Sequence, residues 1–175
     1  MRLFPFLLAP LVLLLGCKKS DADPTAQLPP ATQTGAGTFG CLVNGQPWTP
    51  RGNDGTSNYT VSYDRTYHDG TLNIGAYRLS GSSPVEQVVG FYSDSLRAVG
   101  TLPIKKGGRH QAVFIDNATR CHYYSVDAGT YCRGAITITR LDLQVGVVAG
   151  TFAFTFFKPG CDSIRVTQRR FDRKL

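Results

Sequence analysis

The sequence TFAFTF at residues 151–156 decides the fold. Its three phenylalanines, Phe152, Phe154 and Phe156, alternate with threonine and alanine. Successive side chains of a β-strand point to opposite faces, so this period of two places all three rings on one face. The alternation therefore predicts a strand with a buried aromatic face and a small, polar, exposed face.

The same alternation occurs in shorter runs on the N-terminal side of this segment. These rows are Leu72, Ile74 and Ala76; Ile136 and Ile138; and Tyr59, Val61 and Tyr63. No stretch of the sequence shows the sustained apolar period of 3.6 residues, with capping residues, that predicts an amphipathic helix. We therefore expect an all-β domain.

Glycine marks the points where these strands begin and end. A Gly-Thr pair followed by a large apolar or aromatic residue begins at Gly37, Gly70, Gly100, Gly129 and Gly150. The irregular spacing is typical of strand boundaries and not of a repeat architecture. The Asn-Gly pair at residues 44–45 is a hairpin signal, because both residues tolerate positive φ. Counting runs between turns predicts about eight to ten short strands, in an antiparallel sandwich or a barrel-like meander.

Residues 1–16 have the pattern of a secretory signal. The basic Arg2 precedes an apolar stretch at residues 3–15, and the small Gly16 stands before Cys17. The stretch is shorter than the roughly 20 residues that a transmembrane helix needs, and prolines interrupt it. We therefore predict a signal peptide at residues 1–16 that is removed on export.

The residues LLGC at positions 14–17 resemble the lipobox of bacterial lipoproteins. The resemblance implies cleavage before Cys17 and acylation of its thiol, so that the mature protein is anchored to a membrane without spanning it. In such lipoproteins an aspartate directly after the cysteine favours inner-membrane retention, whereas this chain has Lys18. The resemblance therefore implies an outer-membrane location, on the periplasmic side or at the cell surface.

The mature chain divides into a tether and a domain. Residues 17–37 are rich in Pro, Thr, Ala, Gln and Gly, which predicts a lipidated, flexible tether. The remaining residues, 38–175, have a length that is ordinary for one domain, and we expect a single β-domain there.

The formal net charge of the chain is +7, with basic residues concentrated near the C-terminus. A basic tail can bind nucleic acid, anionic lipid or acidic glycan, but export argues against nucleic acid. The alternation of Ile164 and Val166 with Arg165 and Thr167 instead favours solvated charges on the outer face of a last strand.

The cysteines after Cys17 are even in number. They are Cys41, Cys121, Cys132 and Cys161. In an oxidising compartment they predict two disulfides, and spacing does not decide among the three pairings that four cysteines allow. We take Cys121–Cys132 as a bond across a hairpin and Cys41–Cys161 as a bond between the first and last strands. Metal binding is the weaker alternative, because no C-x-x-C occurs.

Four segments of the mature chain resemble a group of Bacteroidota-type lipoproteins of unknown function. They are residues 38–48, 134–139, 150–154 and 166–172. The resemblance covers most of the mature domain and implies its location and fold, but no activity. The closing motif of that group usually has glycine before Arg-Phe-Asp, whereas this chain has Arg169.

The sequence contains no G-x-S-x-G elbow, no P-loop and no G-x-G-x-x-G motif, so we expect no cofactor. The most catalytic-looking cluster is Asp64, His68 and Asp69, since a carboxylate beside an imidazole can tune a general base. A polar hairpin loop that ends in glycine uses the same residue types, and we favour that interpretation. The oxygens of residues 53–58 could ligate calcium, but their spacing differs from that of an EF-hand loop.

Aromatic residues suggest one binding chemistry. Trp48 is the only tryptophan, and the tyrosines include Tyr77, Tyr92, Tyr123, Tyr124 and Tyr131. Exposed rings on a β-surface can stack against sugars, although rings more often fill a core or pair across strands. The leading hypothesis is a non-enzymatic, membrane-anchored domain that binds a ligand or partner, such as a glycan or an envelope protein. The alternatives are a purely structural role and a hydrolase-like enzyme built around Asp64, His68 and Asp69.

Overall fold

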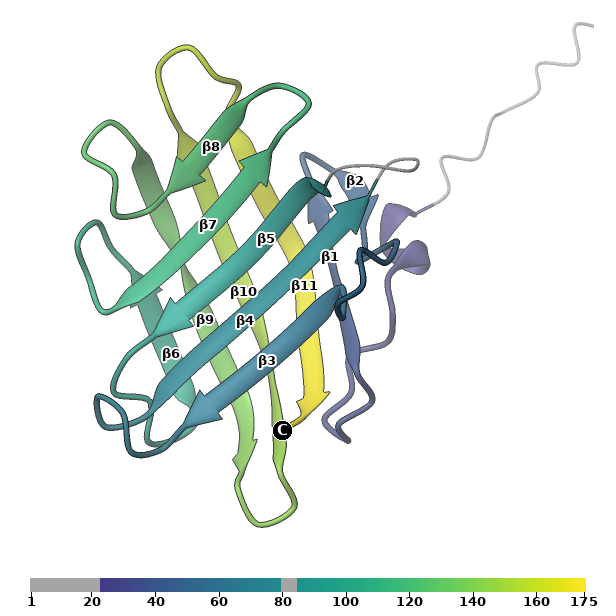
Figure 1. Ribbon diagram of the computed structural model, residues 1–175, viewed down its shortest axis with the longest axis vertical. Helices are drawn as coiled ribbons and strands as arrows, with labels where there is room; N and C mark the ends of the chain where they lie inside the picture. Colours follow the sequence, from purple (N-terminus) through teal and green to yellow (C-terminus); the bar gives the residue numbers. More distant parts are fainter. Residues whose placement is uncertain (1–22, 80–84) are drawn as a thin grey trace, which may run out of the picture.

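The computed structural model describes residues 23–79 and 85–175 (Figure 1). The predicted signal peptide and Cys17 lie outside the described residues. Within those two ranges, no helix is long and apolar enough to cross a membrane.

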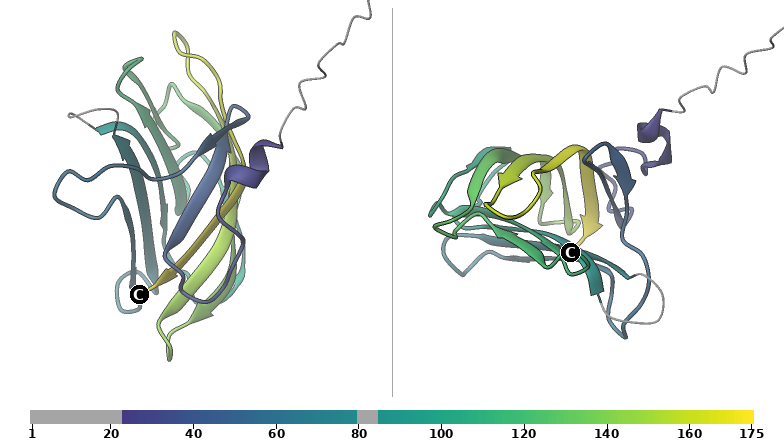
Figure 2. Two further views of the ribbon diagram at one scale, coloured as in Figure 1. Left: turned by 90° about the vertical axis from the view of Figure 1, so that its right-hand side faces the viewer. Right: turned by 90° about the horizontal axis from the view of Figure 1, so that it is seen from above.

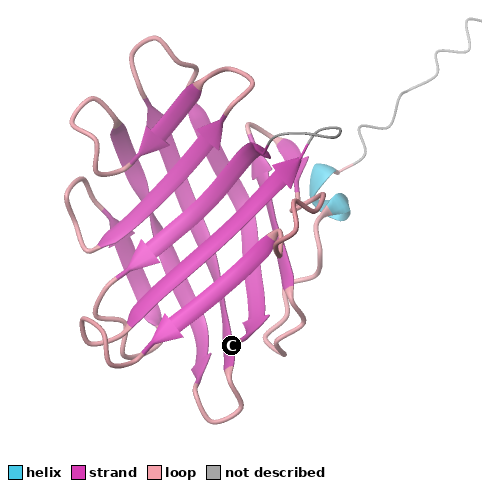
Figure 3. Ribbon diagram, viewed as in Figure 1, coloured by secondary structure: helices cyan, strands magenta, loops and turns pink. Residues whose placement is uncertain are grey.

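The described chain is built almost entirely of strands, with one short 3₁₀ helix (Figure 3). The elements are η1 (Pro24–Gln27), β1 (Thr38–Val43), β2 (Gln46–Trp48), β3 (Tyr59–Asp64), β4 (Thr71–Leu79), β5 (Val85–Ser93), β6 (Gly100–Ile104), β7 (His110–Asp116), β8 (Cys121–Tyr124), β9 (Tyr131–Asp142), β10 (Val147–Phe157) and β11 (Ile164–Lys174). Eleven strands are therefore described, slightly more than the eight to ten expected, because short strands such as β2 and β6 are hard to count from sequence.

The strands form two antiparallel sheets that face each other as a sandwich (Figure 2). Sheet A has the order β2-β1-β11-β10-β9-β6, and sheet B has the order β3-β4-β5-β7-β8. The all-β sandwich is thus confirmed, and the barrel alternative is wrong. The meander is not continuous. β6 follows β5 in sequence but lies in sheet A, where it pairs with β9, and β1 pairs with β11.

The segment TFAFTF lies in β10, near the centre of sheet A, and its phenylalanines are buried as predicted. Phe152 contacts Phe91 of the opposite sheet with ring centroids 4.4 Å apart, and it stacks on Phe39 at 5.2 Å. Thr151 and Ala153 are exposed. Aromatic rings bury large apolar areas and interlock at such distances, so this row joins the two sheets.

A β-bulge interrupts the pairing of β11 beside Arg169. Gln168 has a φ of 53°, in the left-handed region that favours glycine. The register of β10 with β11 shifts between Gly150 and Phe154. The guanidinium of Arg169 donates to the Phe152 carbonyl that the shift leaves outside the ladder, and it lies 5.9 Å from the Phe152 ring centroid. Arg169 therefore occupies a gap in the sheet.

The second half of the predicted tether lies against the domain. Leu28 is buried, Pro29 covers Gly40, and η1 packs beside β2. The carboxylate of Asp172, which is 1% exposed, accepts hydrogen bonds from the Thr32 hydroxyl and from the backbone N–H groups of residues 34, 35 and 36. Composition did not reveal this docking, because the carboxylate that binds these residues lies 136 to 140 positions further along the chain.

Candidate functional site

A cavity of about 630 Å³ opens at the upper end of the sandwich in Figure 1. Sheet A lines it with the β1–β2 hairpin and with the loop between β10 and β11, and sheet B lines it with the ends of β4, β5, β7 and β8. We call it the end cavity. Both layers of the sandwich contribute side chains, so the cavity has a wall from each.

A change in residue type along the inward rows of sheet B creates this cavity. In β4, Leu72, Ile74 and Ala76 are buried, and the next inward position is Arg78. The same step places Gln87 beyond Val89 in β5, and Asp116 beyond Phe114 in β7. The three polar residues are cross-strand neighbours, since Arg78 pairs with Gln87 and Gln87 pairs with Asp116. A polar row thus replaces the apolar core at this end.

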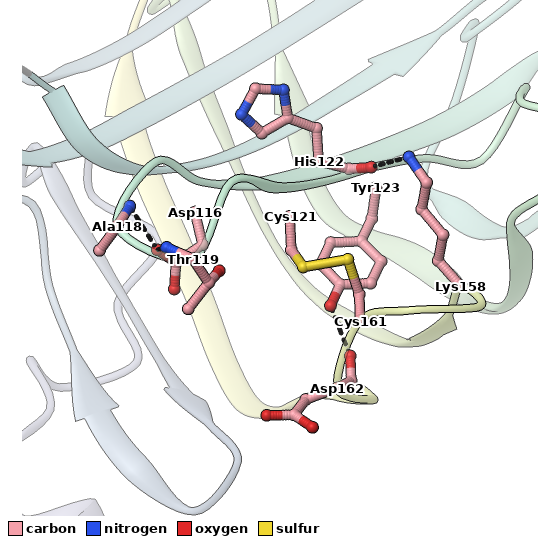
Figure 4. Close-up of a disulfide and its surroundings, with 9 residues drawn as sticks. All are labelled: Asp116, Ala118, Thr119, Cys121, His122, Tyr123, Lys158, Cys161 and Asp162. Atoms are coloured by element: carbon pink, nitrogen blue, oxygen red, sulfur yellow. Dashed lines mark hydrogen bonds between the residues drawn. A yellow bond between two sulfur atoms is a disulfide. The ribbon is translucent and has the colours of Figure 1, made fainter.

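Hydrogen bonds hold the polar row in place. The indole Nε1 of Trp48 donates to Gln87 Oε1 at 2.9 Å, and Gln87 Nε2 donates to Asp116 Oδ2 at 3.0 Å. Asp116 Oδ1 also accepts from the backbone N–H groups of Ala118 and Thr119 (Figure 4). Each side chain is therefore fixed before any ligand arrives, which lowers the entropic cost of binding.

Arg78 is the cation of the end cavity. Its guanidinium lies 5.2 Å from the Trp48 ring centroid, and it donates to the carbonyls of Thr49 and Pro47, each at 3.3 Å. Burial, and then the neighbouring charge of Arg51, lower the pKa of Arg78 from its usual value. None of the ion pairs within residues 23–79 and 85–175 involves Arg78. It is a partly buried charge that no described carboxylate approaches to ion-pair distance, with Glu86 as its electrostatic neighbour.

The floor of the cavity is apolar and the rim is polar. Trp48, Phe114 and Tyr123 are almost fully buried and form the floor together with Ile164. The Tyr123 hydroxyl donates to the carbonyl of Asp162 in the β10–β11 loop, which fixes that ring (Figure 4). An apolar floor with a few oriented polar groups is the usual composition of a small-molecule site.

A disulfide between Cys121 and Cys161 forms one wall of the cavity (Figure 4). It joins β8 of sheet B to the β10–β11 loop of sheet A, with 5.9 Å between the Cα atoms. The predicted pairs Cys121–Cys132 and Cys41–Cys161 are wrong. Residues 125–130 carry the chain from one sheet to the other, so Cys121 and Cys132 do not face each other across a hairpin.

Cys41 and Cys132 are free thiols in the structure. Cys41 is fully buried in β1 opposite Trp48, and Cys132 lies in β9 opposite Phe156. Burial raises the pKa of each thiol to about 12. Both therefore act as small apolar side chains of the core.

The structure gives Asp64, His68 and Asp69 three different partners. Asp64 accepts hydrogen bonds from Thr66 and Tyr67 within its own turn, and Asp69 pairs with Arg97. The imidazole of His68 lies 3.3 Å from Asp94, and its side chain is 53% exposed. The cluster has the local hydrogen bonds expected of a polar loop.

The other two histidines and the loop at residues 53–58 lie in separate places. His110 contacts Ser93, and His122 contacts Asn117. The carboxylate of Asp54 accepts from Thr56 and from Tyr77. Across the described ranges, no three His, Cys, Asp or Glu side chains are grouped so that they could hold a metal ion.

Sequence reasoning missed Arg78, Gln87 and Asp116, although the signal was present. In β4 the alternating row is apolar at residues 72, 74 and 76 and charged at Arg78, which places a cation on the inward face of the strand. Buried charges are rare unless they serve a structural or binding role. The missing information was which strands are neighbours, because only the sheet order brings the three residues together.

Comparisons with protein-family models, with curated proteins and with solved structures gave no match. The resemblance to Bacteroidota-type lipoproteins therefore stays a prediction. Function is inferred below from the residues of the end cavity and from the N-terminal sequence.

Proposed function

We propose that this protein is an outer-membrane lipoprotein, anchored through Cys17, whose β-sandwich binds a small ligand in the end cavity without catalysing a reaction. The anchor is supported by the order of basic, apolar and small residues before the cysteine. The binding role is supported by one observation above all, the polar row of Arg78, Gln87 and Asp116 above an apolar floor.

The residues of the end cavity favour a ligand with an anionic group on an apolar body. Arg78 is the only cation among the described residues that line the cavity and forms no ion pair there, although Glu86 interacts with it electrostatically and Asp162 also lines the cavity. Asp116 is already hydrogen-bonded by Gln87, Ala118 and Thr119, so its charge is compensated by donors. A carboxylate on the ligand would pair with Arg78, and an apolar chain would contact the rings of the floor.

Fluorescence of Trp48 tests the binding role directly. Trp48 is the only tryptophan and lines the cavity, so its emission reports on occupancy. We expect straight-chain fatty carboxylates to change the emission at lower concentration than alcohols of the same chain length. Replacing Arg78 with methionine removes a charged hydrogen-bond donor worth about 1.5–3 kcal/mol and should weaken carboxylate binding by roughly 10- to 100-fold.

Arg51→Met is the matched control for Arg78→Met. Arg51 is a neighbouring arginine that is exposed and does not line the cavity. Its replacement removes a like charge near Arg78 but no group that lines the cavity, so the affinity for carboxylates should not fall. Equal affinity of wild type and Arg78→Met, or a Trp48 emission that no carboxylate changes, would contradict the proposed role of the cavity.

Mass spectrometry of the exported protein tests the anchor. The mature amino terminus should be Cys17 carrying acyl chains, and Cys17→Ser should leave the leader attached and the protein unacylated, because serine lacks the thiol that is modified. An exported chain whose amino terminus is cut elsewhere and carries no lipid would refute the anchor. The ligand titration would be unaffected by that result.

A further inference from the structure

The outer face of sheet B carries a groove that runs over two adjacent glycines, Gly75 and Gly90, and the Val113 side chain covers the second of them. One outward cross-strand row runs over all five strands of the sheet and contains Thr60, Gly75, Gly90, Val113 and Tyr124. A hollow of about 420 Å³ lies over this row, and a second of about 270 Å³ adjoins it, sharing Thr60, Gly75 and Val88. We call the two together the glycine groove. Strands are about 4.8 Å apart, so the row is about 19 Å long.

The fold does not require glycine at position 75. Gly75 does not have the positive φ that favours glycine, and a Cβ built there would meet only Thr60 Oγ1, at 3.4 Å. That distance is an ordinary van der Waals contact, so a Cβ would fit. Glycine weakens the interior of a strand and often marks a place where a ligand approaches the backbone closely. The glycine at position 75 leaves space above the sheet. We assign this space to a bound ligand.

Tyrosine rings border the groove in fixed orientations. The Tyr77 hydroxyl donates to Asp54 at 2.6 Å, and the Tyr92 hydroxyl donates to Asp94. Tyr124, at the β8 end of the row, is 37% exposed. Rings held by their hydroxyls keep their faces in place, which suits stacking against a flat apolar surface of a ligand.

The chemistry of the lining favours a neutral, polyhydroxylated ligand. Among the described residues, none that line the larger hollow is charged, although charged residues make up 18% of the chain. Hydrogen-bonding groups are present as the amides of Asn73 and Gln111 and the hydroxyl of Thr60. An anionic polymer would find no cation here, and a purely apolar partner would leave these amides without hydrogen-bond partners.

We propose that the glycine groove binds a neutral, linear oligosaccharide, with its sugar faces on the tyrosine rings and its hydroxyls on Asn73, Gln111 and Thr60. The groove crosses five strands, so it accommodates an extended chain better than a single sugar. This site is separate from the end cavity, which lies between the sheets.

An array of neutral linear oligosaccharides of glucose, mannose and xylose tests this assignment, with heparin and polygalacturonate fragments as anionic probes. The exported wild-type protein should retain at least one neutral probe and no anionic one. Gly75→Val fills the groove and Tyr124→Ala removes an exposed ring, and each should weaken retention of that probe by about tenfold or more. Ala153→Val, a similar enlargement on the exposed face of sheet A, should bind like wild type.

Thermal unfolding separates loss of the groove from loss of the fold. Valine is a good strand former and a Cβ at position 75 would meet only Thr60 Oγ1, so Gly75→Val should melt close to the wild-type temperature. The assignment is overturned if no neutral probe is retained, if only anionic probes bind, or if Gly75→Val and Tyr124→Ala bind like wild type. Failure of this site is distinguishable from failure of the end cavity, because Arg78→Met should leave oligosaccharide retention unchanged.

Discussion

Replacing both Cys121 and Cys161 with alanine should lower the free energy of unfolding by about 4 kcal/mol, because the bond closes a loop between residues 40 positions apart. In the loop-entropy description, the crosslink restricts the unfolded chain and thereby raises the relative stability of the native state. The bond also joins the two sheets at the cavity wall, where β8 is an edge strand. Urea denaturation of the oxidised wild type and of the double variant measures the difference.

Two controls accompany the disulfide variant. Reduction of the wild-type bond should cause the same loss of stability, while reduction of the double variant should change nothing. Cys132→Ala removes a half-buried thiol that forms no bond and should cost much less. If the double variant unfolds at the wild-type urea concentration, the crosslink does not stabilise this fold.

Replacing Asp172 with alanine should cost about 3 kcal/mol. Its buried carboxylate is the acceptor for the Thr32 hydroxyl and for three backbone N–H groups, and these donors would lose their partner. Residues 32–36 should then separate from β11, so amide hydrogen exchange should rise there first. Asp172→Asn keeps one side-chain oxygen and should lose less stability than Asp172→Ala.

The contribution of Asp172 should also depend on pH in a defined direction. Burial alone would raise the pKa of this carboxyl, but hydrogen bonds from Thr32 and from residues 36, 34 and 35 outweigh it, and the pKa is lowered. A lowered folded-state pKa gives stability that is complete above the unfolded value of about 3.9 and is lost as the pH falls through the folded value. The free energy of unfolding of wild type should therefore fall towards that of Asp172→Asn as the pH drops below about 4. A constant difference across that range would show that ionisation of Asp172 is not linked to folding.

Local patterns in the sequence predicted the strands well. Phe152, Phe154 and Phe156 are buried, and Ile164 and Val166 point inward while Arg165 is exposed, because a period of two is a property of each strand alone. The order of the strands is a property of the whole chain, and it was missed. The alternation of apolar and polar residues does not reveal that β6 lies in sheet A while β5 and β7 lie in sheet B.

The errors on the cysteines and the binding residues have the same origin. Cys121 and Cys132 are close in sequence, yet their strands belong to different sheets. Arg78, Gln87 and Asp116 become a cluster only through the pairing of β4, β5 and β7. Spacing along the chain carries no information on such contacts, because it does not say where each connection crosses the sandwich.

If Cys17 is acylated as we propose, the docking of η1 beside β2 would set which way the molecule faces. The first described residue, Asp23, is six peptide units from Cys17, and a fully extended chain of that length spans about 20 Å. With acyl chains on Cys17, β2 and the opening that it borders would be held close to the lipid headgroups, and the β9–β10 hairpin would project away from them. A fatty acid leaving the bilayer would then meet Arg78 before it reached open water.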